Sequence, residues 1–173
     1  MTNRLFRVIV LALSVSVAVP GLIFAAGKTA RAALPQATAA AKGWQADAVL
    51  TSVSTLTAGA DGTATSWLYS YYSAKVKKWV IVTAAGEKLD SLEVEQGLTG
   101  SVSEDFIDSD KAMQIAQQNG LKGNSPSLGL NVFGSGKTAS VAWAVNGGFE
   151  KGDISVMLDA KNGRFISRTV LDY

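Results

Sequence analysis

The sequence predicts an α+β protein that contains two tandem units, each a helix followed by an antiparallel sheet of four strands. Two stretches place small or apolar residues at helical spacing, and each is followed by four short runs that alternate apolar and polar residues. Turn-forming residues separate these runs. Because the same order of elements occurs twice at nearly equal length, we expect an internal repeat.

The first unit is expected to span residues 33–96. It begins with the alanine-rich stretch LPQATAAAKGWQ (34–45), which has the apolar spacing of a helix. In the second of its strand-like runs, Trp67, Tyr69 and Tyr71 share one face by the two-residue period and are predicted to belong to the core. The four strands are expected at 48–56, 63–72, 78–84 and 88–95.

The second unit is expected to span residues 104–173, after the link QGLTGSVS (96–103). Its helix lies within DSDKAMQIAQQNG (108–120), where Asp108 or Ser109 can cap the N-terminus. The four strands are expected at 127–133, 138–145, 153–160 and 164–170.

The segment ISVMLDAKNGRFIS (154–167) is predicted to form a β-hairpin, because apolar and polar residues alternate on both sides of a turn sequence. Asn162-Gly163 tolerates the positive φ that tight hairpins require. The side chain of Asp159 can accept hydrogen bonds from amides of the turn. We therefore interpret Asp159 as a turn-capping residue, with a catalytic carboxylate as the alternative.

Residues 1–32 match a signal peptide, because a short basic start precedes an uncharged apolar run from Val8 to Ala26. Ala30-Arg31-Ala32 supplies the small residues that a signal peptidase reads, which predicts cleavage after Ala32. The alternative is an uncleaved anchor, since the apolar run approaches the length that spans a bilayer. We expect a periplasmic or secreted protein that meets the membrane only through an uncleaved signal segment, if at all.

The exported chain is expected to be slightly acidic. Removing residues 1–32 removes four of the 16 basic residues and none of the 14 acidic ones, which leaves 12 basic and 14 acidic residues and a net charge of −2. A nucleic-acid partner is excluded, because it would need a basic face on the exported domain. The sequence has no cysteine for a disulfide or for lipid attachment, so burial must hold the fold together.

The residue inventory argues against an enzyme. With neither histidine nor cysteine, the chain cannot form a Ser-His-Asp triad, a thiol nucleophile or an ordinary zinc site. The segment NVFGSGKT (131–138) is no phosphate-binding loop, because Asn131 occupies the first glycine position and a strand is predicted where a helix must follow. We therefore predict no catalytic residue, no cofactor and no metal ligand.

Two groups of acidic residues have structural interpretations. SEDFIDSD (103–110) places acidic residues before and inside the first turn of a predicted helix, where the helix dipole favours them. The alternative is a calcium site, although the residue spacing of an EF-hand loop is absent. Asp90, Glu93 and Glu95 lie on the last predicted strand of the first unit. Charged side chains at such positions protect a sheet edge or face water.

The segment from DSDKAMQIAQQNG through VAWAV to ISVMLDAKNGRFIS resembles the PepSY domain, in which a helix is followed by a Trp-containing strand and a final strand that runs into Asp-Ala, two residues and Gly. The N-terminal half, with WQADAVL and DGTATSWLYSYYS, looks like a degenerate partner. The resemblance implies a cystatin-like helix on an antiparallel sheet, and a role in binding or restraining secreted metallopeptidases or other envelope proteins. Unlike the common propeptide setting, no peptidase is attached to this chain.

The predicted hairpin tip YYSAKVKKW (71–79) is the candidate contact site. Its partner-binding residues are expected to be Tyr72, Lys75, Lys77 and Lys78, because tyrosine anchors interfaces and exposed lysines steer association. The alternative is that the aromatic residues belong to the core and that the lysines keep the loop soluble.

These observations predict an exported, non-enzymatic binding module that modulates a peptidase or another envelope protein. Its partner is expected to be an envelope or secreted protein or a peptide. Two other functions stay open. One is an envelope assembly or structural factor, resembling the tandem helix-plus-sheet folds of secreted β-lactamase inhibitors and small outer-membrane assembly factors. The other is a small-molecule or lipid carrier with a cavity between helix and sheet.

Overall fold

The computed structural model describes residues 27–123, 125–134, 138–149 and 152–171. Along the chain, each of two helices is followed by four strands. The elements are α1 Ala30–Trp44, β1 Val49–Thr55, β2 Ser66–Ser73, β3 Lys78–Ala85, β4 Lys88–Val94, α2 Ser109–Gln118, β5 Ser127–Phe133, β6 Ser140–Phe149, β7 Gly152–Asp159 and β8 Phe165–Leu171.

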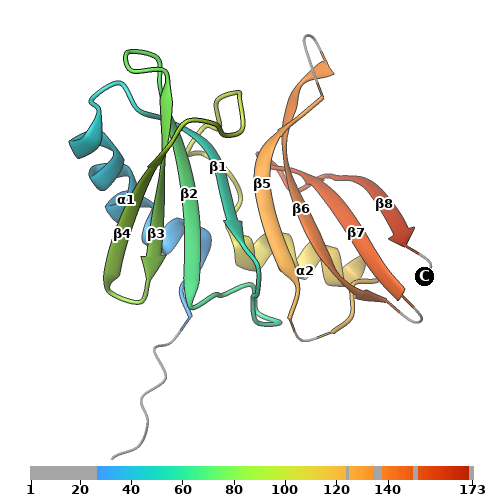
Figure 1. Ribbon diagram of the computed structural model, residues 1–173. Helices are drawn as coiled ribbons and strands as arrows, with labels where there is room; N and C mark the ends of the chain where they lie inside the picture. The colour runs from blue at the N-terminus through green and yellow to red at the C-terminus, as the bar shows by residue number, and fades with distance from the viewer. Residues whose placement is uncertain (1–26, 124, 135–137, 150–151, 172–173) are drawn as a thin grey trace, which may run out of the picture.

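All eight strands belong to one antiparallel sheet in the order β4-β3-β2-β1-β5-β6-β7-β8 (Figure 1). The predicted fold class of two tandem helix-plus-sheet units, with its cystatin-like and PepSY-like arrangement, is therefore wrong. β1 pairs with β5, and Val53 lies opposite Leu130 across this join. Two separate sheets would leave β1 and β5 as edges with unpaired backbone N–H and C=O groups, and their pairing removes both edges.

One face of the sheet packs against both helices and holds the core (Figure 1). Tyr69 of β2 lies opposite Val82 of β3 on this face. The ring centroids of Trp67 and Trp143 are 6.4 Å apart with an edge-to-face angle of 72°, so the core is continuous across the β1–β5 join. The prediction that Trp67, Tyr69 and Tyr71 are core residues is confirmed, because each is buried.

The two helices meet at their N-termini and are capped together. Asp108 Oδ1 accepts a hydrogen bond from the Ser109 backbone N–H at 2.7 Å, which confirms Asp108 as a cap of α2. The same oxygen accepts from the Arg31 N–H at 2.9 Å, and Ser109 Oγ accepts from the Ala30 N–H at 3.0 Å. The N-cap position of α1, Thr29, makes no side-chain cap bond. The start of α1 therefore depends on side chains from α2.

The acidic residues expected near a sheet edge lie there. Asp90 and Glu93 belong to β4, which is the first edge of the sheet, and Glu95 directly follows it. All three are exposed. Charges on an edge strand disfavour pairing with a further chain, so this prediction is confirmed.

Candidate functional site

The sheet face opposite α1 and α2 has no helix on it among the described residues, and we call it the open face. Because side chains alternate along a strand, the residues between the core positions point to it. The open face includes Trp79, Ile81 and Thr83 of β3, Ser66, Leu68, Ser70 and Tyr72 of β2, Ser52 and Ser54 of β1, Ser127, Gly129 and Asn131 of β5, Ala144 and Asn146 of β6, and Ser155 and Met157 of β7.

The centre of the open face is uncharged, and no described residue covers it at Gly129. None of these open-face residues on β2, β1, β5 and β6 has a charged side chain. Gly129 lies between Ser54 and Ala144, and a Cβ atom placed on Gly129 would meet nothing within 4 Å. Most of these open-face side chains are serine or asparagine, but the charged residues that are common on a sheet face in water are missing from them. This centre is therefore open to close approach by another molecule.

Aromatic and aliphatic side chains border the open face at its β3–β4 end. Tyr72 and Trp79 lie opposite each other, with ring centroids 4.6 Å apart. The Trp79 indole N–H donates to the Leu98 carbonyl at 2.9 Å, which fixes the ring. Ile81 pairs with Leu92, whose side chain is 64% exposed. We call Tyr72, Trp79, Ile81 and Leu92 the Trp79 cluster.

The four predicted partner-binding residues do not form one surface. Tyr72 points to the open face, whereas Lys78 lies opposite the buried Ser73 and points to the helix-covered face. The Lys78 ammonium group pairs with the carboxylates of Glu93 at 2.8 Å and Glu95 at 3.0 Å. The sheet therefore separates Lys78 from Tyr72.

The ion pairs of Lys78 are structural contacts. The hydrogen bond with Glu93, followed by that with Glu95, raises the pKa of Lys78. The hydrogen bond from Lys78, followed by one from the Trp44 indole at 2.9 Å, lowers the pKa of Glu93. Lys78 thus joins β3 to β4, and Glu93 joins β4 to α1 through its hydrogen bond with Trp44.

The other two lysines lie at the tip between β2 and β3. Lys75 and Lys77 are exposed, and Lys77 has a positive φ of 57°. Asp47 holds this tip, because its carboxylate accepts from Ser73 Oγ at 2.7 Å and from the Lys75 N–H at 2.9 Å. These two hydrogen bonds lower the pKa of Asp47. Of the predicted lysines, Lys75 and Lys77 are the two available to attract a partner by charge.

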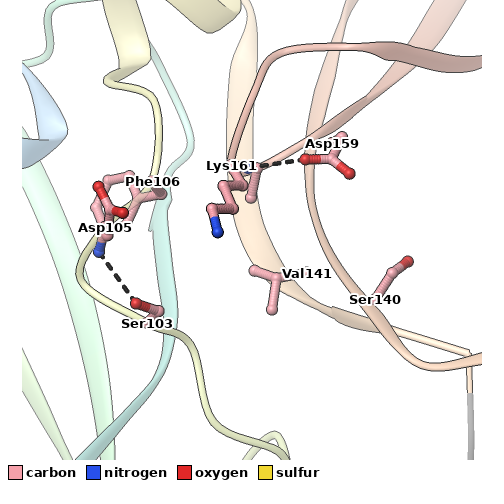
Figure 2. Close-up of a pocket in the computed structure, with 8 residues that line it drawn as sticks. Ser103, Asp105, Phe106, Ser140, Val141, Asp159 and Lys161 are labelled. Carbon is pink, nitrogen blue, oxygen red and sulfur yellow. Dashed lines mark hydrogen bonds between the residues drawn. The ribbon is translucent and has the colours of Figure 1, made fainter. Parts of the chain in front are cut away.

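A pocket of about 300 Å³ opens between the loop that precedes α2 and the turn between β7 and β8 (Figure 2). Its position differs from the cavity between helix and sheet that the carrier alternative requires. This volume lies at the lower limit for small-molecule sites. The lining residues are Ser103, Asp105, Phe106, Ser140, Val141, Asp159, Ala160 and Lys161.

Asp159, on the wall of this pocket, caps the hairpin turn. Its Oδ1 accepts from the backbone N–H groups of Lys161 at 2.9 Å and Asn162 at 3.2 Å (Figure 2 shows the first). Its carbonyl accepts from the Gly163 N–H at 2.9 Å, and Gly163 has a φ of 73°. The turn-capping interpretation is confirmed. Within the described ranges, no group of three or more acidic residues is arranged to hold a metal ion.

The titratable groups deepest in the core are two phenols. The Tyr69 hydroxyl donates to the Ala30 carbonyl at 2.6 Å, and the Tyr71 hydroxyl shares a hydrogen bond with Thr38 Oγ1 at 3.0 Å. Burial raises the pKa of Tyr69, and burial raises the pKa of Tyr71 to about 12. Both phenols therefore stay neutral near pH 7 and serve as hydrogen-bonding core residues.

Comparisons with known proteins show the fold alone. No protein-family model matches the sequence, and no curated protein matches it. The crystal structure of a protein from Clostridium difficile 630, described as a "putative lipoprotein", has a similar fold, with a TM-score of 0.51 at 14% identity over 79% of this chain and 91% of that chain. The PepSY resemblance stays a prediction. No helix in the described part of the chain is long and apolar enough to cross a membrane.

Sequence reasoning missed the open face. Tyr72 and the lysines are close in sequence, but the strand register places Tyr72 and Lys78 on different faces of the sheet. The runs TSVSTL (51–56) and TSWLYSYY (65–72) carry the signal, because serines occupy several of the positions between residues that lie in the core. That alternation predicts a second face with several small side chains.

Proposed function

We propose that this protein is an exported, non-enzymatic binding module that holds another envelope protein, or a peptide of one, against the open face. The observation that supports this function is the uncharged centre of that face, bordered by the Trp79 cluster. Interface cores are depleted in charged residues, and tyrosine and tryptophan are their usual anchors. The partner is expected to present an uncharged surface that can bond with the serine and asparagine side chains of this face, since a buried charge would lack a counter-charge there.

Export to the envelope is supported by two observations. The sequence starts with basic residues followed by an uncharged apolar run, and the similar structure is described as a "putative lipoprotein". Because the sequence has no cysteine to acylate, a periplasmic or secreted form is proposed. A secreted peptidase is the first partner to test, on the PepSY resemblance.

Gly129→Arg tests whether the open face is the binding site. The new side chain has room, and a strand loses no packing when glycine is replaced at such a position. Gln36→Arg is the matched control, because it adds the same residue at an exposed position of α1 on the other side of the sheet. Thermal unfolding of both variants checks that the fold is retained.

Each protein would be immobilised and exposed to envelope extract from the producing cells, and the affinity of every captured protein would then be measured with purified components. We expect a partner that binds the wild type and Gln36→Arg equally and binds Gly129→Arg at least about tenfold more weakly, a difference of about 1.4 kcal/mol. If no captured protein loses affinity for Gly129→Arg, the open face is not the binding site and the proposal is wrong.

A further inference from the structure

The residues directly before α1 pair with the segment that precedes β2. Lys28 and Ala64 exchange two backbone hydrogen bonds, at 2.9 and 3.0 Å, as an antiparallel bridge. The Lys28 carbonyl also accepts from the indole N–H of Trp67 at 2.7 Å, and Trp67 is 1% exposed. The Lys28 ammonium group pairs with Glu87 at 2.8 Å. Lys28 is therefore part of the folded domain.

The first turn of α1 is also hydrogen-bonded to β2 and to the start of α2. The Ala30 carbonyl accepts from the Tyr69 hydroxyl at 2.6 Å, and the Ala30 N–H donates to Ser109 Oγ at 3.0 Å. Ala30, Tyr69 and Ser109 are all fully buried. The Arg31 N–H donates to the cap residue Asp108. These bonds join residues that lie before the predicted cleavage point to the centre of the core.

Cleavage after Ala32 would remove every one of these partners. The indole N–H of Trp67 and the hydroxyl groups of Tyr69 and Ser109 would lose the acceptors or donors that the structure gives them. A buried polar group left without a partner is costly, so such a product would be a poorly folded protein. The cleavage site predicted from the sequence conflicts with the fold.

We propose that export processing retains Lys28 and that the signal peptidase of the exporting cell hydrolyses the peptide bond between Gly27 and Lys28. Ala25 and Gly27 supply small residues at the two positions that such a peptidase reads. Water adds a hydroxyl group to the Gly27 carbonyl carbon and a proton to the Lys28 nitrogen. The new Gly27 carboxyl group releases its proton, and the Lys28 amine takes one up to become an ammonium group, which still carries N–H groups to donate to the Ala64 carbonyl.

This inference rests on the export in the proposed function, but not on the open face. The first test expresses the full chain in an exporting bacterium and determines the mass and N-terminal sequence of the protein in the envelope or medium. We expect Lys28 as the first residue. An N-terminus at Ala33, or an intact Met1 on the exported chain, overturns the proposal.

A pair of variants gives a second test that depends on processing alone. Gly27→Leu should block cleavage and leave the precursor to accumulate, because it puts a large residue at the position before the proposed cut. Ala32→Leu, at an exposed position, should be processed as fast as the wild type. The reverse pattern would place the cut after Ala32 and overturn the proposal.

A third test compares chains 28–173 and 33–173, each made without a signal segment. We expect the shorter chain to unfold at a temperature at least about 10 °C lower, because several buried hydrogen bonds are lost together. Equal unfolding temperatures would show that residues 28–32 are dispensable and would remove the physical basis of the inference.

Discussion

Replacement of Gly163 tests the turn that connects β7 and β8. Gly163 is buried at a φ of 73°, and its N–H donates to the Asp159 carbonyl. A Cβ atom placed there would lie 2.7 Å from Ile115 Cδ1 and 3.2 Å from Ile107 Cδ1. A valine at this position would therefore have both an unfavourable backbone conformation and too little space.

The two effects can be estimated separately. A residue other than glycine held in the left-handed region costs about 1 to 3 kcal/mol. Excess volume in a packed interior costs about 1 to 3 kcal/mol more, and the flexible ends of the two isoleucines favour the lower part of that range. We expect Gly163→Val to lower the free energy of unfolding by about 2 to 4 kcal/mol.

Asp159→Asn is the matched variant in the same turn. An asparagine side chain keeps a carbonyl oxygen that can accept the two hydrogen bonds now made by Asp159 Oδ1, so the cost should stay below about 1 kcal/mol. Urea unfolding of both variants, followed by tryptophan fluorescence, measures the two free energies. A Gly163→Val protein within about 0.5 kcal/mol of the wild type, the range of an ordinary surface substitution, would refute this account of the turn.

Three further outcomes are expected. Burial raises the pKa of Tyr71 from its ordinary value of 10.0 to about 12, so this contribution to stability is fully present below pH 10 and is lost as the pH rises toward 12. The melting temperature should therefore fall between pH 10 and pH 12, and less so for Tyr71→Phe; an equal fall in both proteins would contradict this account. Tyr71→Ala should lower the melting temperature at pH 7, because it leaves a cavity in the core, and an unchanged temperature would contradict its buried position. Tyr72→Ala should weaken partner binding by about 1 to 2 kcal/mol, whereas replacing Lys75 and Lys77 with glutamine should mainly slow association, as binding kinetics at two salt concentrations would show.

The sequence predicts the local structure of this protein well, because local patterns depend on neighbouring residues. The two-residue period of Trp67, Tyr69 and Tyr71 identifies a buried face, and Asp159 and Gly163 identify the hairpin turn. Each of these features depends on residues a few positions apart. The same reasoning also finds the helices and strands near their observed positions.

The sequence does not predict how the strands join. The pairing of β1 with β5 depends on two edges far apart in sequence, and alternation within each strand is the same whether the edges meet or not. Which of the candidate contact residues share a face depends on the register as well. Tyr72 and Lys78 are near in sequence, but the register places Lys78 opposite Ser73 and so on the other face.

The sequence also does not predict that Asp108 caps both helices. Asp108 can be identified as a cap of α2 from its position before the helix. That the same carboxylate accepts from Arg31 of α1 depends on the close approach of two distant segments. The prediction of cleavage after Ala32 uses only the small residues around that point, whereas the contact of Arg31 with Asp108 is seen only in the structure.

The join between β1 and β5 has a consequence for how the sheet moves. Its ladder contains four residue pairs, from Ser52–Asn131 to Thr55–Leu128, against eight between β2 and β3. Backbone amides on this short ladder should exchange with deuterated solvent sooner than those of β2 and β3. Ser54 and Gly129 face each other across it on the open face. A molecule bound there would span both halves of the chain, slow the exchange of these amides and stiffen the sheet at its least paired position.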